Sequence, residues 1–198
     1  MAEQYLRKLT PEEGKTLEAW WEWLDDHRGD RSRLRRAVSP EDVVLTNAFF
    51  HFLTQMDWKE EQALLRYALV AGIVSHVKQN QVPRLEKKAL GGKKRTVLVG
   101  FAGQLATPKE GAQRPVMSET RFQQLQKSDS LETFYRQVLR AVRLLGGNVN
   151  LLSLADNLLH WYDEFHRLQH YQAQKPQDRL AVRWATEYFS TLTHFNLI

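Results

Sequence analysis

Two copies of one helix-start signal constrain the fold of this 198-residue chain more than any other feature: TPEE at 10–13 and SPED at 39–42. In each copy, a Thr or Ser that can cap a helix precedes a proline at the first helical position. The first copy adds Glu13 three residues after Thr10, which is the spacing of a capping box. Apolar residues at helical spacing then follow each signal: Leu17, Trp20, Trp21 and Leu24 after the first, and Phe49, Phe50 and Leu53 after the second. Each signal is therefore predicted to open one helix.

The same pattern continues along the chain. Further helix starts are predicted at Asp57 with Glu60, at Asp129 with Glu132, at Asn150, and after Pro176, and the helix from Asp129 is expected to stop at Gly146-Gly147. No segment shows the sustained alternation of apolar and polar residues that is typical of a strand. The sequence therefore predicts an all-α fold, a multi-helix bundle in a single domain over 1–198, with helices in 1–80 and 118–198.

The segment 81–117 differs from the rest. It is rich in glycine, holds three of the six prolines and has no helical period. It also carries the basic cluster RLEKKALGGKKR at 84–95, with six cations and one acid. A loop of this length is usually functional or disordered. We therefore expect one long basic loop between two helical halves.

Composition limits the class of protein. The chain has 28 Lys and Arg against 23 Asp and Glu, a formal net charge of +5, and no cysteine, so it can form neither a disulfide nor a thiolate zinc site. No run of 18 apolar residues occurs, so no membrane partner is expected. These features predict a soluble, cytoplasmic protein.

Catalytic patterns are absent from the sequence. GGKKRT at 91–96 lacks the spacing of a P-loop, and there is neither a G-x-S-x-G motif nor a cysteine nucleophile. His166 and His170 have the i, i+4 spacing of a metal pair, but no third ligand is evident. We therefore expect no catalytic residue, no metal site and no cofactor.

The predicted helix over 129–145 has two unlike faces. Leu131, Tyr135, Val138, Val142 and Leu145 share one side at 100° per residue, and Arg136, Arg140 and Arg143 lie within about 60° of one another on the opposite side. A row of this kind alone can be an ordinary solvated face. Together with the clusters at 28–36 and 84–95, and with Arg121 and Lys127, it favours a surface that follows phosphates. The clusters contain almost only Lys and Arg, which suits backbone contact without base readout.

The tryptophans are predicted to be core residues rather than platforms for bases. Trp20, Trp21, Trp161 and Trp184 lie on apolar helical faces.

Taken in order, these segments resemble the CasB family, the small subunit of Cascade, which is the RNA-guided type I-E CRISPR interference complex. The resemblance lies in AWWEWL, LRRAVSPEDV, FFHFLTQMDW, QALLRYALVAGIVSH and VGFAGQLA, and most specifically in MSETRFQQLQKSDSLETFYRQVLRAVRLL followed by LLSLADNLLHWYD. It implies an all-α, non-catalytic subunit present in two copies, which contacts the RNA-bearing backbone subunits and the large subunit. It also implies a basic face that holds the displaced DNA strand and supports the pairing of guide RNA with target DNA.

The resemblance assigns nucleic-acid contacts to four sets of residues. These are Arg35 and Arg36 before the second helix, Arg121 and Lys127, the row Arg136, Arg140 and Arg143, and Lys87, Lys88, Lys93 and Lys94 in the basic loop. Two positions depart from the family pattern. Gln104 stands where an arginine is often found, and Asp163-Glu164 stand where basic residues can occur, leaving Arg167 as a substitute.

Two further expectations concern the first cluster and the alternatives. Arg28, Arg31 and Arg33 have no support from the resemblance and are expected to be solvated, with Asp30 neutralising one of them.

A free-standing helical DNA-binding regulator that dimerises alone is the alternative function, and an enzyme is a distant third.

Overall fold

Helices make up most of the chain in the computed structural model, which describes residues 6–56, 63–88, 94–169 and 175–197. They are α1 (Pro11–Asp26), α2 (Arg28–Arg36), α3 (Pro40–Val44), α4 (Asn47–Leu53), α5 (Ala63–Val74), α6 (Phe101–Ala106), α7 (Glu119–Gln126), α8 (Leu131–Leu144), α9 (Leu151–Gln169) and α10 (Leu180–His194). A short 3-10 helix, Pro176–Asp178, precedes α10. The predicted all-α fold class is confirmed.

Several predicted helix ends have the expected hydrogen bonds. The Thr10 hydroxyl accepts from the backbone N–H of Glu13 at 3.2 Å, and the Glu13 carboxylate accepts from the Thr10 N–H at 2.8 Å, which completes the capping box of α1. Asn150 caps α9, since its side-chain oxygen accepts from the Ser153 N–H at 3.1 Å. Gly146 and Gly147 end α8 with φ angles of +69° and +85°, a left-handed turn that glycine adopts without strain.

Two predicted starts need correction. The helix that begins after Ser39 stops at Val44, because the Thr46 hydroxyl accepts from the Phe49 N–H at 3.3 Å and so caps a separate helix, α4. Ser130, rather than Asp129, caps α8, with its hydroxyl accepting from the Thr133 N–H at 3.2 Å. The predicted start at Asp57 and Glu60 lies outside the described residues.

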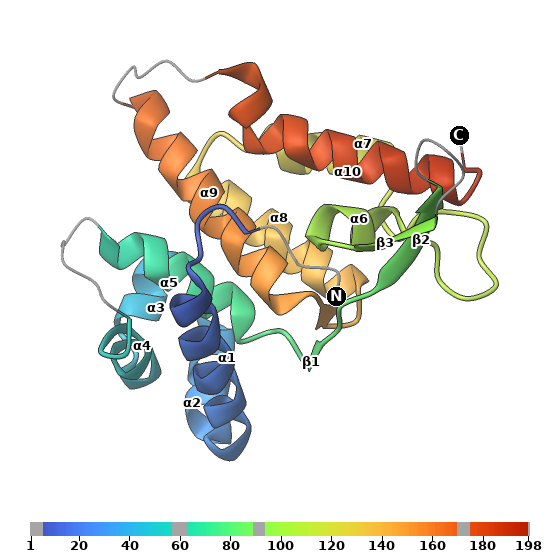
Figure 1. Cartoon of the computed structure of the whole chain (residues 1–198). Helices are drawn as coiled ribbons and strands as arrows, with labels where there is room; N and C mark the ends of the chain where they lie inside the picture. Colours follow the sequence, from blue (N-terminus) through green and yellow to red (C-terminus); the bar gives the residue numbers. More distant parts are fainter. Residues whose placement is uncertain (1–5, 57–62, 89–93, 170–174, 198) are drawn as a thin grey trace.

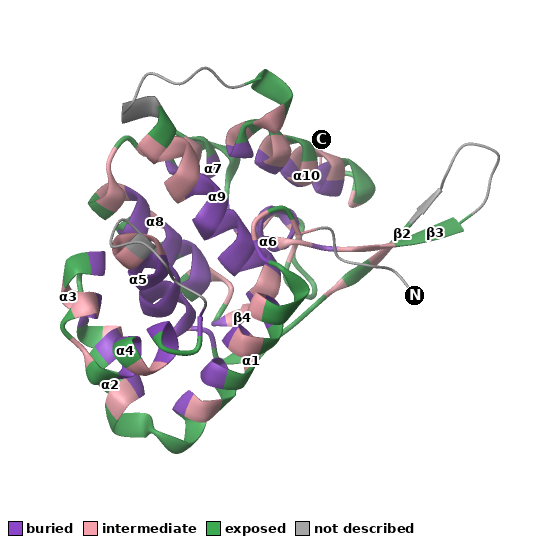
Figure 2. Ribbon diagram, turned by 60° about the vertical axis from the view of Figure 1, so that its left-hand side comes forward, coloured by how far each residue is buried: buried purple, intermediate pink, exposed green. Residues whose placement is uncertain are grey.

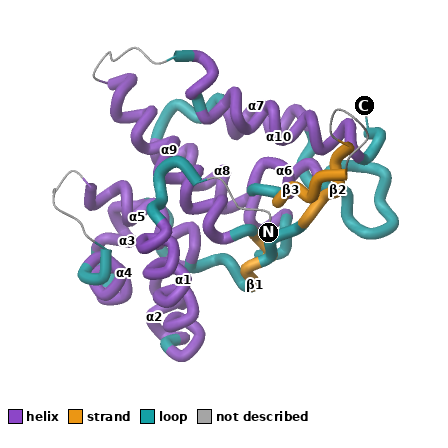
Figure 3. The backbone as a smooth tube through the Cα atoms, viewed as in Figure 1, coloured by secondary structure: helices purple, strands orange, loops and turns teal. Residues whose placement is uncertain are grey.

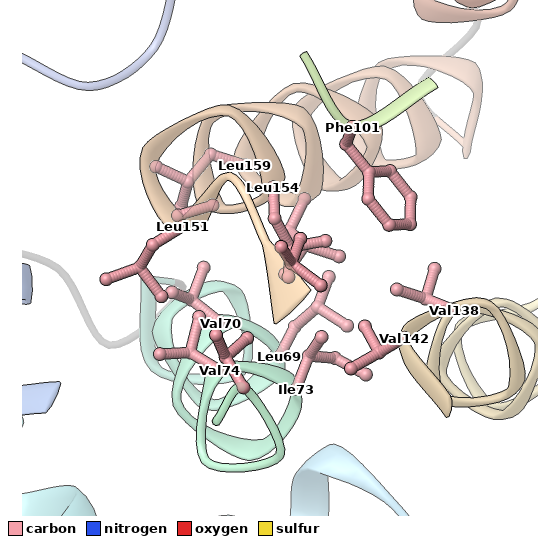
Figure 4. Packing of buried hydrophobic residues seen from close by; sticks show 14 of the residues in the cluster. Leu69, Val70, Ile73, Val74, Phe101, Val138, Val142, Leu151, Leu154 and Leu159 are labelled. Atoms are coloured by element: carbon pink, nitrogen blue, oxygen red, sulfur yellow. The ribbon is translucent and has the colours of Figure 1, made fainter. Parts of the chain in front are cut away.

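The core is built around α5 and α9. Figure 1 shows α1 to α5 grouped on one side, α6, α7 and α10 on the other, and α8 and α9 between them. Apolar side chains from three helices meet there, as Figure 4 shows: Leu69, Val70, Ile73 and Val74 of α5, Val138 and Val142 of α8, and Leu151, Leu154 and Leu159 of α9. Burial of each such side chain contributes about 1.5–3 kcal/mol, so this packing fixes the position of α8 against the N-terminal helices.

The four tryptophans predicted to be core residues are buried, which confirms that prediction. Trp20 and Trp21 also donate their indole N–H groups to the Ala48 and Val77 carbonyls, at 3.2 and 3.1 Å. Trp161 stacks on Phe134 with ring centroids 3.9 Å apart, and Trp184 lies 6.0 Å from the Phe101 ring.

The segment 81–117 is not one loop, contrary to the prediction. Arg84–Lys88 (β2) pairs antiparallel with Lys94–Leu98 (β3), and α6 follows with all of its residues buried. Two short strands, β1 (Gln79–Asn80) and β4 (Asn148–Val149), also pair in parallel. Figure 3 shows strands β2 and β3, in orange, among the helices. A helix that is buried on all sides has no polar face, which explains why α6 shows no helical period in the sequence. The β2–β3 hairpin projects from the helical body (Figure 2).

No helix among the described residues has the length and apolar character to cross a membrane.

Candidate nucleic-acid interface

Helix α8 presents its three arginines to solvent, as the sequence predicts. Its inner side is buried through Phe134, Tyr135, Val138, Leu139, Ala141 and Val142, while Arg136, Arg140 and Arg143 are exposed. Within the described ranges, none of the three arginines forms an ion pair with a carboxylate of this chain. The row is therefore a cationic surface held on a rigid, well-packed helix.

Helix α2 uses its arginines differently, and one prediction for it is wrong. Arg31 was expected to be solvated, but it is only 8% exposed. Its Nε donates to the Ser75 carbonyl at 3.2 Å and its Nη2 to the Val77 carbonyl at 2.8 Å. Its remaining nitrogen pairs with Asp25, so Asp25, and not Asp30, neutralises an arginine of this cluster. Carbonyls at the C-terminal end of a helix attract cations. Arg31 supplies the cation for the Ser75 and Val77 carbonyls, which directly follow α5.

Arg35 combines a structural contact with partial exposure. Its Nε donates to the Ser75 carbonyl at 2.8 Å, one helical turn from Arg31. Burial, and then the positive charge of Arg31, lower the pKa of Arg35 from its ordinary value, while Asp25 opposes that shift. Arg35 stays charged near neutral pH because an arginine side chain does not lose its proton there. Because Arg35 is half-exposed, part of its charged guanidinium can still contact a ligand.

The other cations of α2 lie in solvent. Arg36, predicted to contact nucleic acid, is exposed, as are Arg28 and Arg33.

The charges of Arg35 on α2 and of Arg143 on α8 both act on one residue, His76. His76, in the turn after α5, is half-buried, and burial followed by the charges of Arg143, Arg35 and Arg31 lowers its pKa to about 4. Two clusters that are a hundred residues apart in the sequence therefore act on one imidazole.

The remaining predicted contacts lie on other elements. Arg121 is exposed on α7, and Lys127 is exposed at the end of that helix. Lys94 is exposed on β3, with its Nζ 3.0 Å from the Glu86 carboxylate on β2. The hairpin register sets Lys87 opposite Arg95 and Lys88 opposite Lys94. The side chains of Lys87 and Lys88, and the whole of Lys93, lie outside the described residues.

The two departures from the family pattern have structural roles. Gln104 is buried, accepts from the Asn150 N–H at 2.7 Å and donates to the Gln81 carbonyl at 3.3 Å, so it joins β1 to the start of α9. Asp163 binds Lys8 Nζ at 2.5 Å and Arg66 Nε at 2.9 Å, which ties the N-terminal segment and α5 to α9. Glu164 accepts from the Leu180 N–H at 2.7 Å at the start of α10. Arg167, the proposed substitute, is exposed.

Of the two histidines with metal-pair spacing, His166 lies near the end of the part of α9 that the structure describes. His166 is half-buried on α9, and His170 lies outside the described residues. In the part of the chain that the structure describes, no group of three or more His, Asp or Glu side chains is placed to hold a metal.

Sequence reasoning missed the inward role of Arg31 and the position of His76. A signal for Arg31 was present, since Arg31 and Arg35 flank Leu34 on the same side of a helix that has no other buried apolar residue. His76 has no comparable signal, because its surroundings come from α2 and α8.

Comparison with known proteins identifies the family of this chain. The sequence model of the family described as CRISPR-associated protein Cse2 matches residues 30–189. A curated CRISPR-associated protein Cse2 from Thermus thermophilus is 26% identical over 181 residues, which cover 87% of this chain and 89% of that protein. No solved structure matches. The chain therefore belongs to the Cse2 family of CRISPR-associated proteins, the small subunits of type I-E Cascade that are also called CasB.

Proposed function

We propose that this Cascade subunit is non-catalytic and stabilises the R-loop by binding the nucleic-acid backbone without reading its sequence. The ligands are the displaced DNA strand and the guide RNA paired with target DNA. The observation that carries the proposal is the α8 row, in which Arg136, Arg140 and Arg143 are exposed and, within the described residues, unpaired on a helix fixed by its buried side. Arg35 and Arg36 on α2, Arg121, Lys127 and Lys94 add exposed or half-exposed positive charge.

The physical role follows from the balance of strand exchange. Replacing a DNA duplex by an RNA–DNA duplex is close to neutral in free energy, so contacts to the backbone can decide the direction. Arginines without base-reading neighbours supply such contacts at any sequence. A subunit with this surface favours the open R-loop and leaves recognition to the guide.

The partners proposed with this role are the RNA-bearing backbone subunits, the large subunit and a second copy of this chain. Val38 and Leu45, which flank α3, are 73% and 85% exposed and provide apolar surface for contacts of this kind. Reconstituting Cascade with and without this chain, and measuring its stoichiometry by native mass spectrometry, tests these partners. Two copies per complex are expected, and a single copy or none contradicts the assignment.

Binding to single-stranded DNA across a salt series tests the nucleic-acid role. Neutralising about five phosphates predicts a slope of log affinity against log salt near −3.5, equal for oligonucleotides of unrelated sequence. A flat salt response contradicts the proposal. A strong preference for one duplex sequence would support a free-standing regulator instead.

A further inference from the structure

The turn after α5 is joined to the end of α8 by backbone hydrogen bonds. The Gly147 N–H donates to the Val142 carbonyl in the last turn of α8 at 3.0 Å. The Gly147 carbonyl in turn accepts from the N–H groups of Lys78 and Gln79, at 2.8 and 3.2 Å. Strands β1 and β4 continue this pairing, with Gln79 opposite Asn148. The backbone of Lys78 is therefore fixed beside the C-terminal end of α8.

The Lys78 side chain lies over Gly147. A Cβ atom at Gly147 would lie 2.9 Å from Lys78 Cγ and 3.2 Å from Lys78 Cβ and Cδ, which is closer than the carbon atoms of neighbouring side chains pack. Glycine leaves this space open, and glycine also adopts the φ of +85° at this position without strain. The first three carbons of the Lys78 side chain are therefore held against the turn.

Lys78 is exposed to solvent although these carbons are packed. Val77 beside it is fully buried, so Lys78 lies on the solvent side of the turn. Within the described ranges, its Nζ forms neither an ion pair nor a hydrogen bond. A lysine of this kind packs its carbons on the protein and keeps its charge in water. The charge of Lys78 is therefore accessible to a ligand.

The end of α8 has backbone caps of its own. A cation near a helix C-terminus often serves the last carbonyls of that helix. Here the Gly147 N–H binds the Val142 carbonyl, and the Gly146 N–H binds the Arg143 carbonyl at 2.9 Å. Capping of these two carbonyls therefore does not account for the charge of Lys78.

We propose that Lys78 binds a phosphate of the nucleic-acid backbone and extends the cationic row of α8 beyond the end of that helix. Arg136, Arg140 and Arg143 span about 10 Å of the helix axis at 1.5 Å per residue. The turn that carries Lys78 is bonded to the last turn of the same helix. The inference rests on the proposed function and deepens it, because it adds a contact that is absent from the sequence-predicted set. It also gives the bound strand a path, along α8 and then over the glycine turn toward β1.

The packed side chain favours this contact. A flexible lysine loses rotamer freedom when it binds, whereas part of the Lys78 side chain is already held by the fold. An ammonium group meets a phosphate as a point charge, so the contact does not depend on the base. Each neutralised phosphate of a single strand contributes about 0.7 to the slope of log affinity against log salt. Lys78 should therefore strengthen binding equally for oligonucleotides of unrelated sequence.

Fluorescence anisotropy of the full chain with labelled oligothymidylate, measured across a salt series, tests the role of Lys78. The variant Lys78→Gln removes the charge but keeps a side chain over Gly147, so we expect the salt slope to weaken by about 0.7. Lys78→Arg keeps the charge and should keep the slope. The urea midpoint of unfolding should stay unchanged in both variants, because the charged end of Lys78 is exposed.

Two further variants make the test specific to this position. Lys109 is an exposed lysine between α6 and α7, so Lys109→Gln removes an equal charge and should leave the salt slope unchanged. Combining Lys78→Gln with Arg143→Ala should weaken the slope by about 1.4, because each side chain neutralises a phosphate of its own.

The outcomes separate this inference from the proposed function. If the wild-type chain binds with the expected salt slope and Lys78→Gln does not change it, Lys78 is not a contact and the proposed function stands. A flat salt response of the wild-type chain contradicts the proposed function and overturns the inference with it. Equal weakening by Lys78→Gln and Lys109→Gln assigns the effect to overall charge and overturns the inference alone. A lower urea midpoint for Lys78→Gln with an unchanged slope makes Lys78 a structural residue.

Discussion

Helices α2 and α8 are both rich in arginine, yet only α2 turns some of its arginines inward. Of the five arginines of α2, Arg31 and Arg35 turn inward and donate to carbonyls of Ser75 and Val77 in the turn after α5. All three arginines of α8 face solvent, and none is paired within the described residues. The same residue type thus supports the fold through two positions of α2 and lies wholly on the surface in α8.

The difference follows from how many apolar residues each helix contains. Six residues of α8 are buried, and all are aromatic or aliphatic, so no inward position is left for an arginine. In α2 the buried residues are Leu34 and Arg31 alone. A long arginine side chain then fills the inward side and covers Trp21 at 5.7 Å from its ring centroid. Charge density by itself therefore does not predict exposure, but charge density and apolar content together do.

The largest effect is expected from Arg31→Ala. The change removes two hydrogen bonds to carbonyls, the contact over Trp21 and the partner of Asp25. Hydrogen bonds from a buried charged group are worth more than neutral ones, so we expect the free energy of unfolding to fall by about 2–4 kcal/mol. Urea unfolding followed by circular dichroism measures it.

Arg33→Ala is the matched control for this prediction. Arg33 lies on the same helix but is exposed, so its removal should change the free energy of unfolding by less than about 0.5 kcal/mol. Equal losses for both variants would show that α2 has no inward arginine side, and the contrast with α8 would then disappear.

The next effect concerns binding rather than stability. In the variant Arg136→Ala, Arg140→Ala, Arg143→Ala, the slope of log affinity against log salt for single-stranded DNA should weaken by about 2, since each phosphate contributes about 0.7. The free energy of unfolding should stay within about 1 kcal/mol, because these side chains are exposed and alanine favours helix. Fluorescence anisotropy across a salt series and urea unfolding measure the two quantities.

A variant with equal loss of charge controls for net charge alone. Lys15, Arg114 and Arg179 are exposed on other parts of the chain, so changing these three to alanine should leave the salt slope unchanged. If both triple variants weaken binding equally, the effect comes from overall charge. If the α8 variant unfolds, its arginines are structural and the two helices do not differ.

The features that were predicted from the sequence are local ones. The capping box at Thr10 and Glu13, the cap at Asn150 and the glycine stop after α8 need only neighbouring residues. The outward direction of the α8 arginines follows from helical periodicity within a single segment.

The features that were missed depend on distant parts of the chain. Arg31 is inward because α5 ends beside it, and its carbonyl partners are more than forty residues away. Helix α6 has no period because it is enclosed on all sides, and hairpin β2–β3 alternates too little to indicate a strand. The pattern within α2 indicates which side of that helix is inward. It does not identify the distant carbonyls that an inward arginine contacts.

Arg35→Ala should lower both the free energy of unfolding and the salt slope of binding, each by less than the variants above. One hydrogen bond to the Ser75 carbonyl is lost, while Arg31 still donates to that oxygen, so we expect about 1 kcal/mol less stability. The salt slope should weaken by about 0.7, because one phosphate contact is removed. Urea unfolding and anisotropy on the same preparation measure both. A loss in only one quantity would assign Arg35 wholly to the fold or wholly to the ligand.

The smallest effect is expected from Arg36→Ala, which tests whether one arginine of α2 behaves like those of α8. Arg36 follows Arg35 directly but is exposed and forms no ion pair within the described residues. Its removal should weaken the salt slope by about 0.7 and change the free energy of unfolding by less than about 0.5 kcal/mol. Urea unfolding and fluorescence anisotropy across a salt series measure these two quantities. If the free energy of unfolding falls as much as for Arg35→Ala, Arg36 also stabilises the fold. Helix α2 would then differ from α8 at this position too.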